Sequence, residues 1–115
     1  MGNPVVHFEI GCRDQEATGR FYSDLFAWRL HPAGPAVHIE TGSQGGIPGH
    51  ITSLGHEPHQ YILFYVAVDD IEQTLARAEQ LGGKRLVGPI ELPTGSFAWF
   101  QDPGGNTVGL WKDKG

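Results

Sequence analysis

The 115-residue sequence has one cysteine, few basic residues and no long apolar run. Cys12 alone cannot form an intramolecular disulfide or a zinc site built from cysteines. No apolar stretch approaches the roughly 18 residues that a membrane-spanning helix requires. Residues 1–10 also lack the basic region of a secretory leader. We therefore expect a soluble, cytoplasmic protein in a reducing environment, with no membrane partner.

Basic residues are outnumbered by acidic ones. Eight Lys and Arg residues stand against 13 Asp and Glu residues, giving a formal net charge of −5. The longest basic cluster is the pair Lys84-Arg85. A nucleic-acid-binding protein requires a basic stripe that neutralises phosphates, so this class of partner is excluded. An apolar fraction of 39 % over this length is typical of one globular domain, here residues 1–115.

The first half of the chain combines a strand, a helix and further strands. Residues 5–10 alternate, which predicts a strand with Val6, Phe8 and Ile10 on one face and Val5, His7 and Glu9 on the other. Asp14 is typical of a helix N-cap, and the helix is expected over 14–27. Its apolar stripe consists of Ala17, Phe21 and Leu25, widened by Tyr22 and Phe26. Strands are predicted at 28–31, 36–41 and, less regularly, 49–54.

The second half repeats this order. A strand is predicted at 61–68, a helix opened by Asp70 with Gln73 three residues on, and a left-handed helix end at Gly82-Gly83. Strands follow at 84–87, 96–101 and 107–111, and residues 102–106 (Asp-Pro-Gly-Gly-Asn) favour a tight turn between the last two. Asp14 and Asp70 are 56 residues apart, almost half the chain. The sequence therefore predicts two βαβββ modules, at about 4–56 and 60–112.

This duplicated unit, together with His7, Phe21-Tyr22 and the 102–106 turn before a final strand, resembles the vicinal oxygen chelate superfamily. That superfamily includes glyoxalase I, bleomycin-resistance proteins, fosfomycin-resistance enzymes and extradiol dioxygenases. The resemblance covers essentially the whole chain. It implies an α+β fold in which both modules form a curved eight-stranded mixed sheet with helices on its outer face.

Metal-dependent members of that superfamily hold a divalent ion between their modules. His7 matches the ligand of the first strand. The positions that match the other two ligands are Leu63 and Gly109, and the first module's alternative position lies near Gly46-Ile47. Leucine and glycine side chains coordinate no metal, and a catalytic ion usually needs three protein ligands. We therefore expect no cofactor, with a divalent ion at His7 as the alternative.

Strand alternation also predicts the residues that face a ligand. They form an apolar, aromatic wall with a few polar groups, which is the usual composition of a small-molecule pocket. The candidates are His7, Glu9, Tyr65, Phe97, Trp99, Gln101 and Trp111, with Leu63, Ala67, Thr107 and Gly109 on the same faces. The alternative is that the aromatic side chains fill the core or a dimer interface.

The remaining histidines and Cys12 give weaker indications of function. His50, His56 and His59 lie in a loop-rich stretch and are expected to be solvated, and His38 shares a strand face with Glu40. Cys12 has no histidine partner that the sequence assigns, so a structural thiol is expected.

Three functions remain open. The first is a metal-independent small-molecule-binding protein similar to the bleomycin-resistance branch, in which aromatic side chains stack on the ligand while His7, Glu9 and Gln101 orient it. The second is a glyoxalase-like metal-dependent lyase, isomerase or dioxygenase with relocated ligands, such as His7, Glu9 and a loop residue. The third is a protein-interaction or regulatory module with a vestigial cavity. The resemblance also implies a homodimer.

Overall fold

The computed structural model of the chain describes residues 2–54 and 58–115. Its elements follow the order βαβββ twice. The first set is β1 (Val5–Gly11), α1 (Gln15–Phe26), β2 (Arg29–Ala33), β3 (Ala36–Glu40) and β4 (Gly49–Thr52). The second set is β5 (Tyr61–Ala67), α2 (Ile71–Gln80), β6 (Lys84–Leu92), β7 (Gly95–Gln101) and β8 (Thr107–Asp113). The predicted duplication is therefore present.

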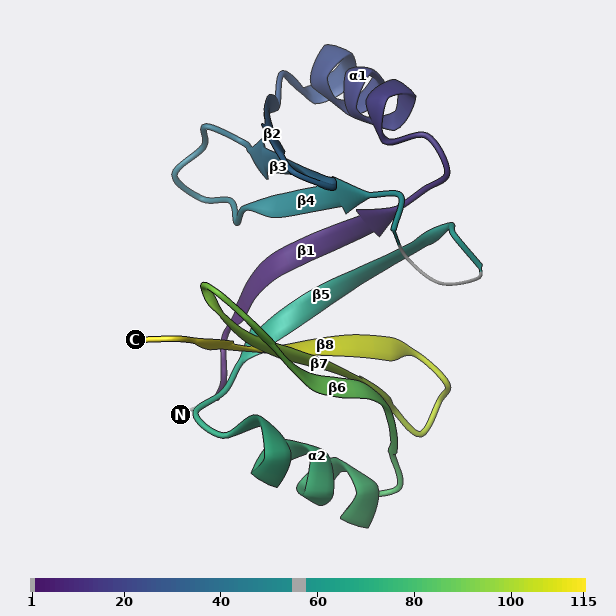
Figure 1. The fold of residues 1–115 in the computed structure, drawn as a ribbon, viewed down its shortest axis with the longest axis vertical. Helices are drawn as coiled ribbons and strands as arrows, with labels where there is room; N and C mark the ends of the chain where they lie inside the picture. Colours follow the sequence, from purple (N-terminus) through teal and green to yellow (C-terminus); the bar gives the residue numbers. More distant parts are fainter. Residues whose placement is uncertain (1, 55–57) are drawn as a thin grey trace. The chain divides into compact units, whose positions relative to one another are not determined.

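The strands of the first set form a mixed sheet in the order β2-β3-β4-β1, and those of the second set form a mixed sheet in the order β5-β8-β7-β6 (Figure 1). This confirms the α+β class. The chain divides into two compact units. We call His7–Leu63 the N-terminal unit, and the residues up to Val6 together with Phe64–Gly115 the C-terminal unit. No helix within the described residues is long and apolar enough to span a membrane.

In the N-terminal unit, β1 pairs with β4 in parallel, while β3 is antiparallel to both β2 and β4. Helix α1 begins where it was predicted, because the Asp14 carboxylate accepts the Ala17 backbone N–H at 3.0 Å. The core holds buried apolar residues of three strands and the segment after β1, with aromatic side chains packed at its margin. They are Ile10, Cys12, Val37, Ile39 and Ile51, with Phe8, Tyr22, Trp28 and Leu30 against them.

The predicted buried face of α1 is correct at Tyr22 but wrong at Phe21 and Leu25. Phe21 and Leu25 are 59 % and 58 % exposed, whereas Gly19 is buried and Tyr22 packs against the core. A Cβ atom on Gly19 would lie 3.1 Å from Leu30 Cδ1, so the helix backbone approaches the sheet closely at this residue. The contact face is thus selected by a small residue, which a count of apolar side chains cannot detect.

In the C-terminal unit, β5 pairs with β8 in parallel, and β7 lies between β8 and β6 in antiparallel pairs. Helix α2 is capped by the Asp70 carboxylate, which accepts the Gln73 backbone N–H at 3.0 Å. Ile71 and Leu75 of this helix are buried, but Leu81, which follows its last residue, is 63 % exposed. Strand β6 is longer than predicted and crosses two register shifts before it ends at Leu92.

The turn at residues 102–106 is held by its own side chains. The Asp102 carboxylate accepts the backbone N–H groups of Gly104 and Asn106, both at 2.9 Å. It also accepts from the Asn106 side-chain amide. These hydrogen bonds lower the pKa of Asp102 below its ordinary value, and those from Asn106 have the largest effect. The predicted tight turn is therefore confirmed, and it aligns β8 beside β7.

Candidate functional site

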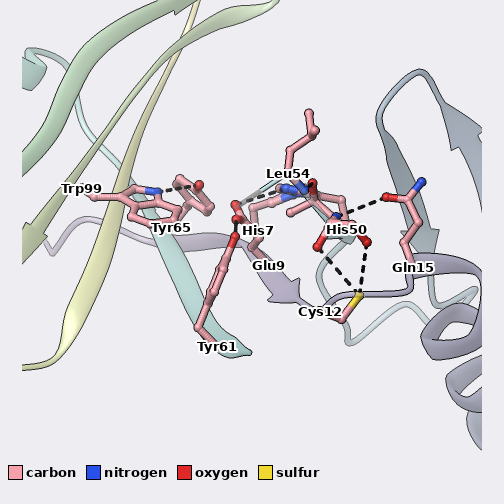
Figure 2. A network of polar contacts seen from close by, with 11 residues as sticks. His7, Glu9, Cys12, Gln15, His50, Leu54, Tyr61, Tyr65 and Trp99 are labelled. Atoms are coloured by element: carbon pink, nitrogen blue, oxygen red, sulfur yellow. Dashed lines mark hydrogen bonds and ion pairs between the residues drawn. The ribbon is translucent and has the colours of Figure 1, made fainter. Parts of the chain in front are cut away.

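A chain of four polar side chains crosses the strands of the N-terminal unit. The His7 Nε2 atom lies 2.7 Å from His50 Nδ1, and His50 Nε2 lies 3.1 Å from Glu9 Oε1. The Tyr61 hydroxyl donates a hydrogen bond to Glu9 Oε2. Figure 2 shows these side chains pointing toward one another. We call His7, Glu9, His50 and Tyr61 the Glu9 network.

Strand alternation explains the position of this network. Phe8 and Ile10 of β1 pack into the core that α1 covers, so the side chains of His7 and Glu9 lie on the opposite face of the sheet. The parallel pairing of β1 with β4 places His50 directly opposite Glu9. His7 and Glu9 are two residues apart on this face, so the imidazole of His50 lies close enough to contact both side chains.

The Glu9 network is largely withdrawn from solvent. Glu9 is only 4 % exposed, and the His50 side chain is 21 % exposed. Burial, followed by the neighbouring charge of His50, lowers the pKa of His7 to about 4, so this imidazole is neutral at pH 7. Burial first, and then the hydrogen bond to Glu9, raises the pKa of Tyr61 above its ordinary value of 10.0. Tyr61 therefore keeps its proton and acts as a donor.

The expectation that His50 is a solvated loop residue is wrong. His50 lies in β4, and the carboxylate of Glu9 and the ring of His7 hold it in place. The expectation that the first module's second position falls near Gly46-Ile47 is also wrong. Glu9 of the first module is equivalent to Tyr65 of the second. Glu9 pairs with His50 and Tyr65 pairs with Gly109, so His50 is the residue equivalent to Gly109. Alternation of Gly49 and Ile51 with His50 in the sequence is the signal that predicts its side chain on the polar face.

Two further histidines extend the polar face toward the sheet edge. His38 lies opposite His50, and His31 lies opposite His38. The ring centroids of His38 and His50 are 6.4 Å apart. His31 is exposed and contacts the exposed carboxylate of Glu40 at 3.3 Å. His31 and His38 are exposed. His59 is half-buried rather than fully solvated as predicted, and His56 lies outside the described residues.

The C-terminal unit has aromatic side chains where the N-terminal unit has polar ones. Trp99, 6 % exposed, donates its indole N–H to the Tyr65 hydroxyl at 2.8 Å, and the Tyr65 and Phe97 rings meet edge to face. A Cβ atom on Gly109 would lie 2.4 Å from Tyr65 Cδ2. Glycine is therefore required at this position because the tyrosine ring occupies the space.

The remaining predicted site residues have separate contacts. The Gln101 amide donates to the Gly105 carbonyl at 3.3 Å and so supports the 102–106 turn. The Trp111 indole donates to the Asp113 carboxylate at 2.6 Å. Leu63 is buried among the core residues. The structure thus brings His7 and Glu9 together in one unit, and Tyr65, Phe97 and Trp99 together in the other.

The donor set does not fit a metal ion held by three side chains. His50 directs one ring nitrogen to His7 and the other to Glu9, so the three groups do not converge on one point. Across residues 2–54 and 58–115, no group of three or more His, Cys, Asp or Glu side chains is arranged to hold an ion. The Leu63 and Gly109 positions supply no further ligand.

Comparison with known proteins places the chain in a family. Residues 5–110 match the Glyoxalase/Bleomycin resistance protein/Dioxygenase superfamily, and the chain belongs to it. A glyoxylase-like domain-containing protein from Didymella fabae is 34 % identical over 113 residues, covering 90 % of this chain and 88 % of that protein.

Two further similarities come from bacteria. The anthracycline biosynthesis protein DnrV from Streptomyces peucetius is 27 % identical over 124 residues; the match covers 91 % of this chain but 45 % of that relative. A superfamily member of known structure from Vibrio splendidus has a TM-score of 0.64 at 18 % identity, covering 97 % of this chain and 99 % of that one. The predicted membership and fold class are therefore confirmed.

Proposed function

We propose that the chain is a small-molecule-binding protein of the glyoxalase/bleomycin-resistance type, and that its ligand is anchored by the Glu9 network without a resident metal ion. The observation that carries this proposal is the buried Glu9 carboxylate, which accepts from Tyr61 and contacts His50, with His7 beyond it. Burying such groups costs free energy, and apolar residues of similar volume often give equal or greater stability. A buried titratable cluster with a shifted pKa is a candidate functional site.

His7 supplies a directed polar contact rather than a positive charge. The pKa of His7, lowered to about 4, leaves its ring neutral at physiological pH. Both Glu9 oxygens contact side chains of the protein itself. Such a site favours a ligand that is recognised by hydrogen bonds, and we expect an aromatic or peptide-like metabolite more than a free phosphate.

A screen by thermal unfolding tests this proposal. Untagged protein in EDTA is heated with a library of planar aromatic and peptide-like compounds. A compound present at about 100 times its dissociation constant stabilises the folded state by about 2.7 kcal/mol. We expect the gain to be lost in His7→Ala and kept in His31→Ala, which removes an exposed histidine of the same face. Failure of every compound, or full stabilisation of His7→Ala, would contradict the proposal.

A metal-dependent lyase, isomerase or dioxygenase is the alternative, and one contact favours it. The facing nitrogens of His7 and His50 are 2.7 Å apart, close enough for two ligands of one ion. Neither nitrogen would then carry a proton, and a third ligand would have to come from another residue. In that case, EDTA would abolish stabilisation by every compound, and a divalent cation would restore it.

Homodimer formation and a cytoplasmic location stay predictions. Light scattering coupled to size-exclusion chromatography measures the first directly. A mass of twice 12.5 kDa is expected.

A further inference from the structure

The face of α1 that is turned away from the sheet of its own unit has an apolar centre. The helix approaches the sheet through Gly19. At 100° per residue, Phe21 and Leu25 lie on the opposite side, where they are 59 % and 58 % exposed. The two side chains are four residues apart and are therefore neighbours on the helix surface. Adjoining exposed apolar side chains, unlike scattered ones, mark interaction sites.

Two charged residues of opposite sign border this apolar centre. Arg20 and Asp24 are exposed, and neither side chain forms an ion pair within the part of the chain that the structure describes. Asp24 also lies in the last turn of α1, where the helix carbonyl groups give a partial negative charge that disfavours a carboxylate. The outer face of α1 consists of Arg20, Phe21, Asp24 and Leu25. The helix by itself leaves the two charges of this face without partners.

An antiparallel copy of the same helix is complementary to the outer face. In a two-fold pair of helices, each residue before the axis faces a residue after it on the partner. With the axis beside residues 22 and 23, Phe21 faces Leu25 of the partner copy. Arg20 then faces Asp24 of the partner copy, and the symmetry repeats both contacts. We propose that the protein forms a homodimer in which the outer face of α1 packs antiparallel against the same face of a second copy.

The small size of this face makes the dimer a weak one. Helix α1 has 12 residues, whereas a stable interface buries about 800 Å² on each partner and involves 20 or more residues. We therefore expect a monomer–dimer equilibrium, with the dimer present only at high protein concentration. Urea unfolding of dilute protein then measures the monomer. Dimerisation through α1 requires no ligand, so its failure is distinct from failure of the ligand screen.

Sedimentation equilibrium at protein concentrations from about 10 µM to 1 mM tests the proposal. The mass should rise from 12.5 kDa toward twice that value. Asp24→Arg should raise the dissociation constant of the dimer at least about tenfold, because the new arginine faces Arg20 of the partner copy. The double variant Arg20→Asp/Asp24→Arg should restore it to within about threefold of the wild type, since the two charges stay complementary when they are exchanged. Phe21→Gln should raise it about tenfold.

The control is Glu91→Arg, which reverses an exposed charge in β6 and should leave the dissociation constant unchanged. Circular dichroism shows whether each variant is folded. A monomer at every concentration would overturn the proposal. So would a dimer that Asp24→Arg does not weaken, because another surface would then hold it. Failure of the exchanged pair to recover dimerisation would overturn the contact between Arg20 and Asp24.

Discussion

His50 and Gly109 occupy the same register position in the two modules, yet one is an imidazole and the other has no side chain. His50 lies opposite Glu9 in the parallel pair β1–β4, and Gly109 lies opposite Tyr65 in the parallel pair β5–β8. The duplicated fold is therefore kept while its equivalent positions differ. In the first module the hydrogen-bonded Glu9 network occupies this position, and in the second module a tyrosine ring occupies it.

Gly109→Ala should destabilise the protein by about 1–3 kcal/mol, because its methyl group would overlap the Tyr65 ring. Urea unfolding measures the loss. The double variant with Tyr65→Ala should lose less than the two single variants combined, since removing the ring makes room for the methyl group. Gly45→Ala is the control, because a Cβ atom there has nothing within 4 Å. Strict additivity of the two changes would show that the ring does not require the glycine.

Stability should fall as the pH is lowered through the range in which His7 titrates. Unfolded His7 takes up a proton near 6.5, whereas the folded protein takes it up only at about 4. Between these values the unfolded state binds more protons, so the unfolding free energy decreases from pH 7 to pH 4. Partial solvent exposure reduces this contribution to roughly 1–2 kcal/mol.

Urea unfolding of wild type and His7→Gln at several pH values isolates this contribution. The unfolding free energy of the wild type, relative to that of His7→Gln, should decrease from pH 7 to pH 4 and stay constant at lower pH. His31→Gln should follow the wild type. A His7 midpoint above pH 6 in an NMR titration would contradict the burial of this ring.

Tyr61 should release its proton only well above pH 10. Burial and its hydrogen bond to Glu9 keep the folded tyrosine protonated after the unfolded one has ionised. The folded state then binds more protons, so stability falls as the pH rises through the alkaline range. Ultraviolet absorbance of tyrosinate follows the titration. Tyr61→Phe should remove the component that titrates late; loss of a component near pH 10 would count against the contact.

The exposed apolar side chains Phe21 and Leu25 of α1 should contribute little to stability. Phe21→Gln and Leu25→Gln are each expected to cost less than about 0.5 kcal/mol, since both side chains are more than half exposed. Tyr22→Ala should cost roughly 2–4 kcal/mol, because its ring packs against the core and stacks on Trp28 at 5.4 Å. Equal losses at positions 21 and 22 in urea unfolding would show that the helix uses its predicted stripe after all.

Local signals in the sequence were sufficient for the fold. Asp14 and Asp70 cap their helices as predicted, and their separation of 56 residues indicated the duplication. The face of α1 could not be predicted in this way. A sheet contact through Gly19 leaves no apolar side chain in the pattern, while Phe21 and Leu25 of the predicted stripe remain exposed.

The candidate site was predicted only in part. Alternation placed His7 and Glu9 on one face of β1, and this is correct. His50 was missed because the modules differ in length: 56 residues separate Glu9 from Tyr65, but 59 separate His50 from Gly109. A single offset therefore cannot align both pairs. The role of Tyr61 depends on the missing side chain at Gly11, which is a contact between strands that no local pattern contains.

The metal content of the protein is the most direct test of the central claim, that the Glu9 network is complete through its own hydrogen bonds. Untagged protein, purified without nickel, is incubated with zinc, nickel, manganese or iron, dialysed without chelator and analysed by plasma mass spectrometry. We predict less than about a tenth of an ion per chain in every case. About one ion per chain, lost in His7→Ala, would contradict the account and identify His7 as a metal ligand.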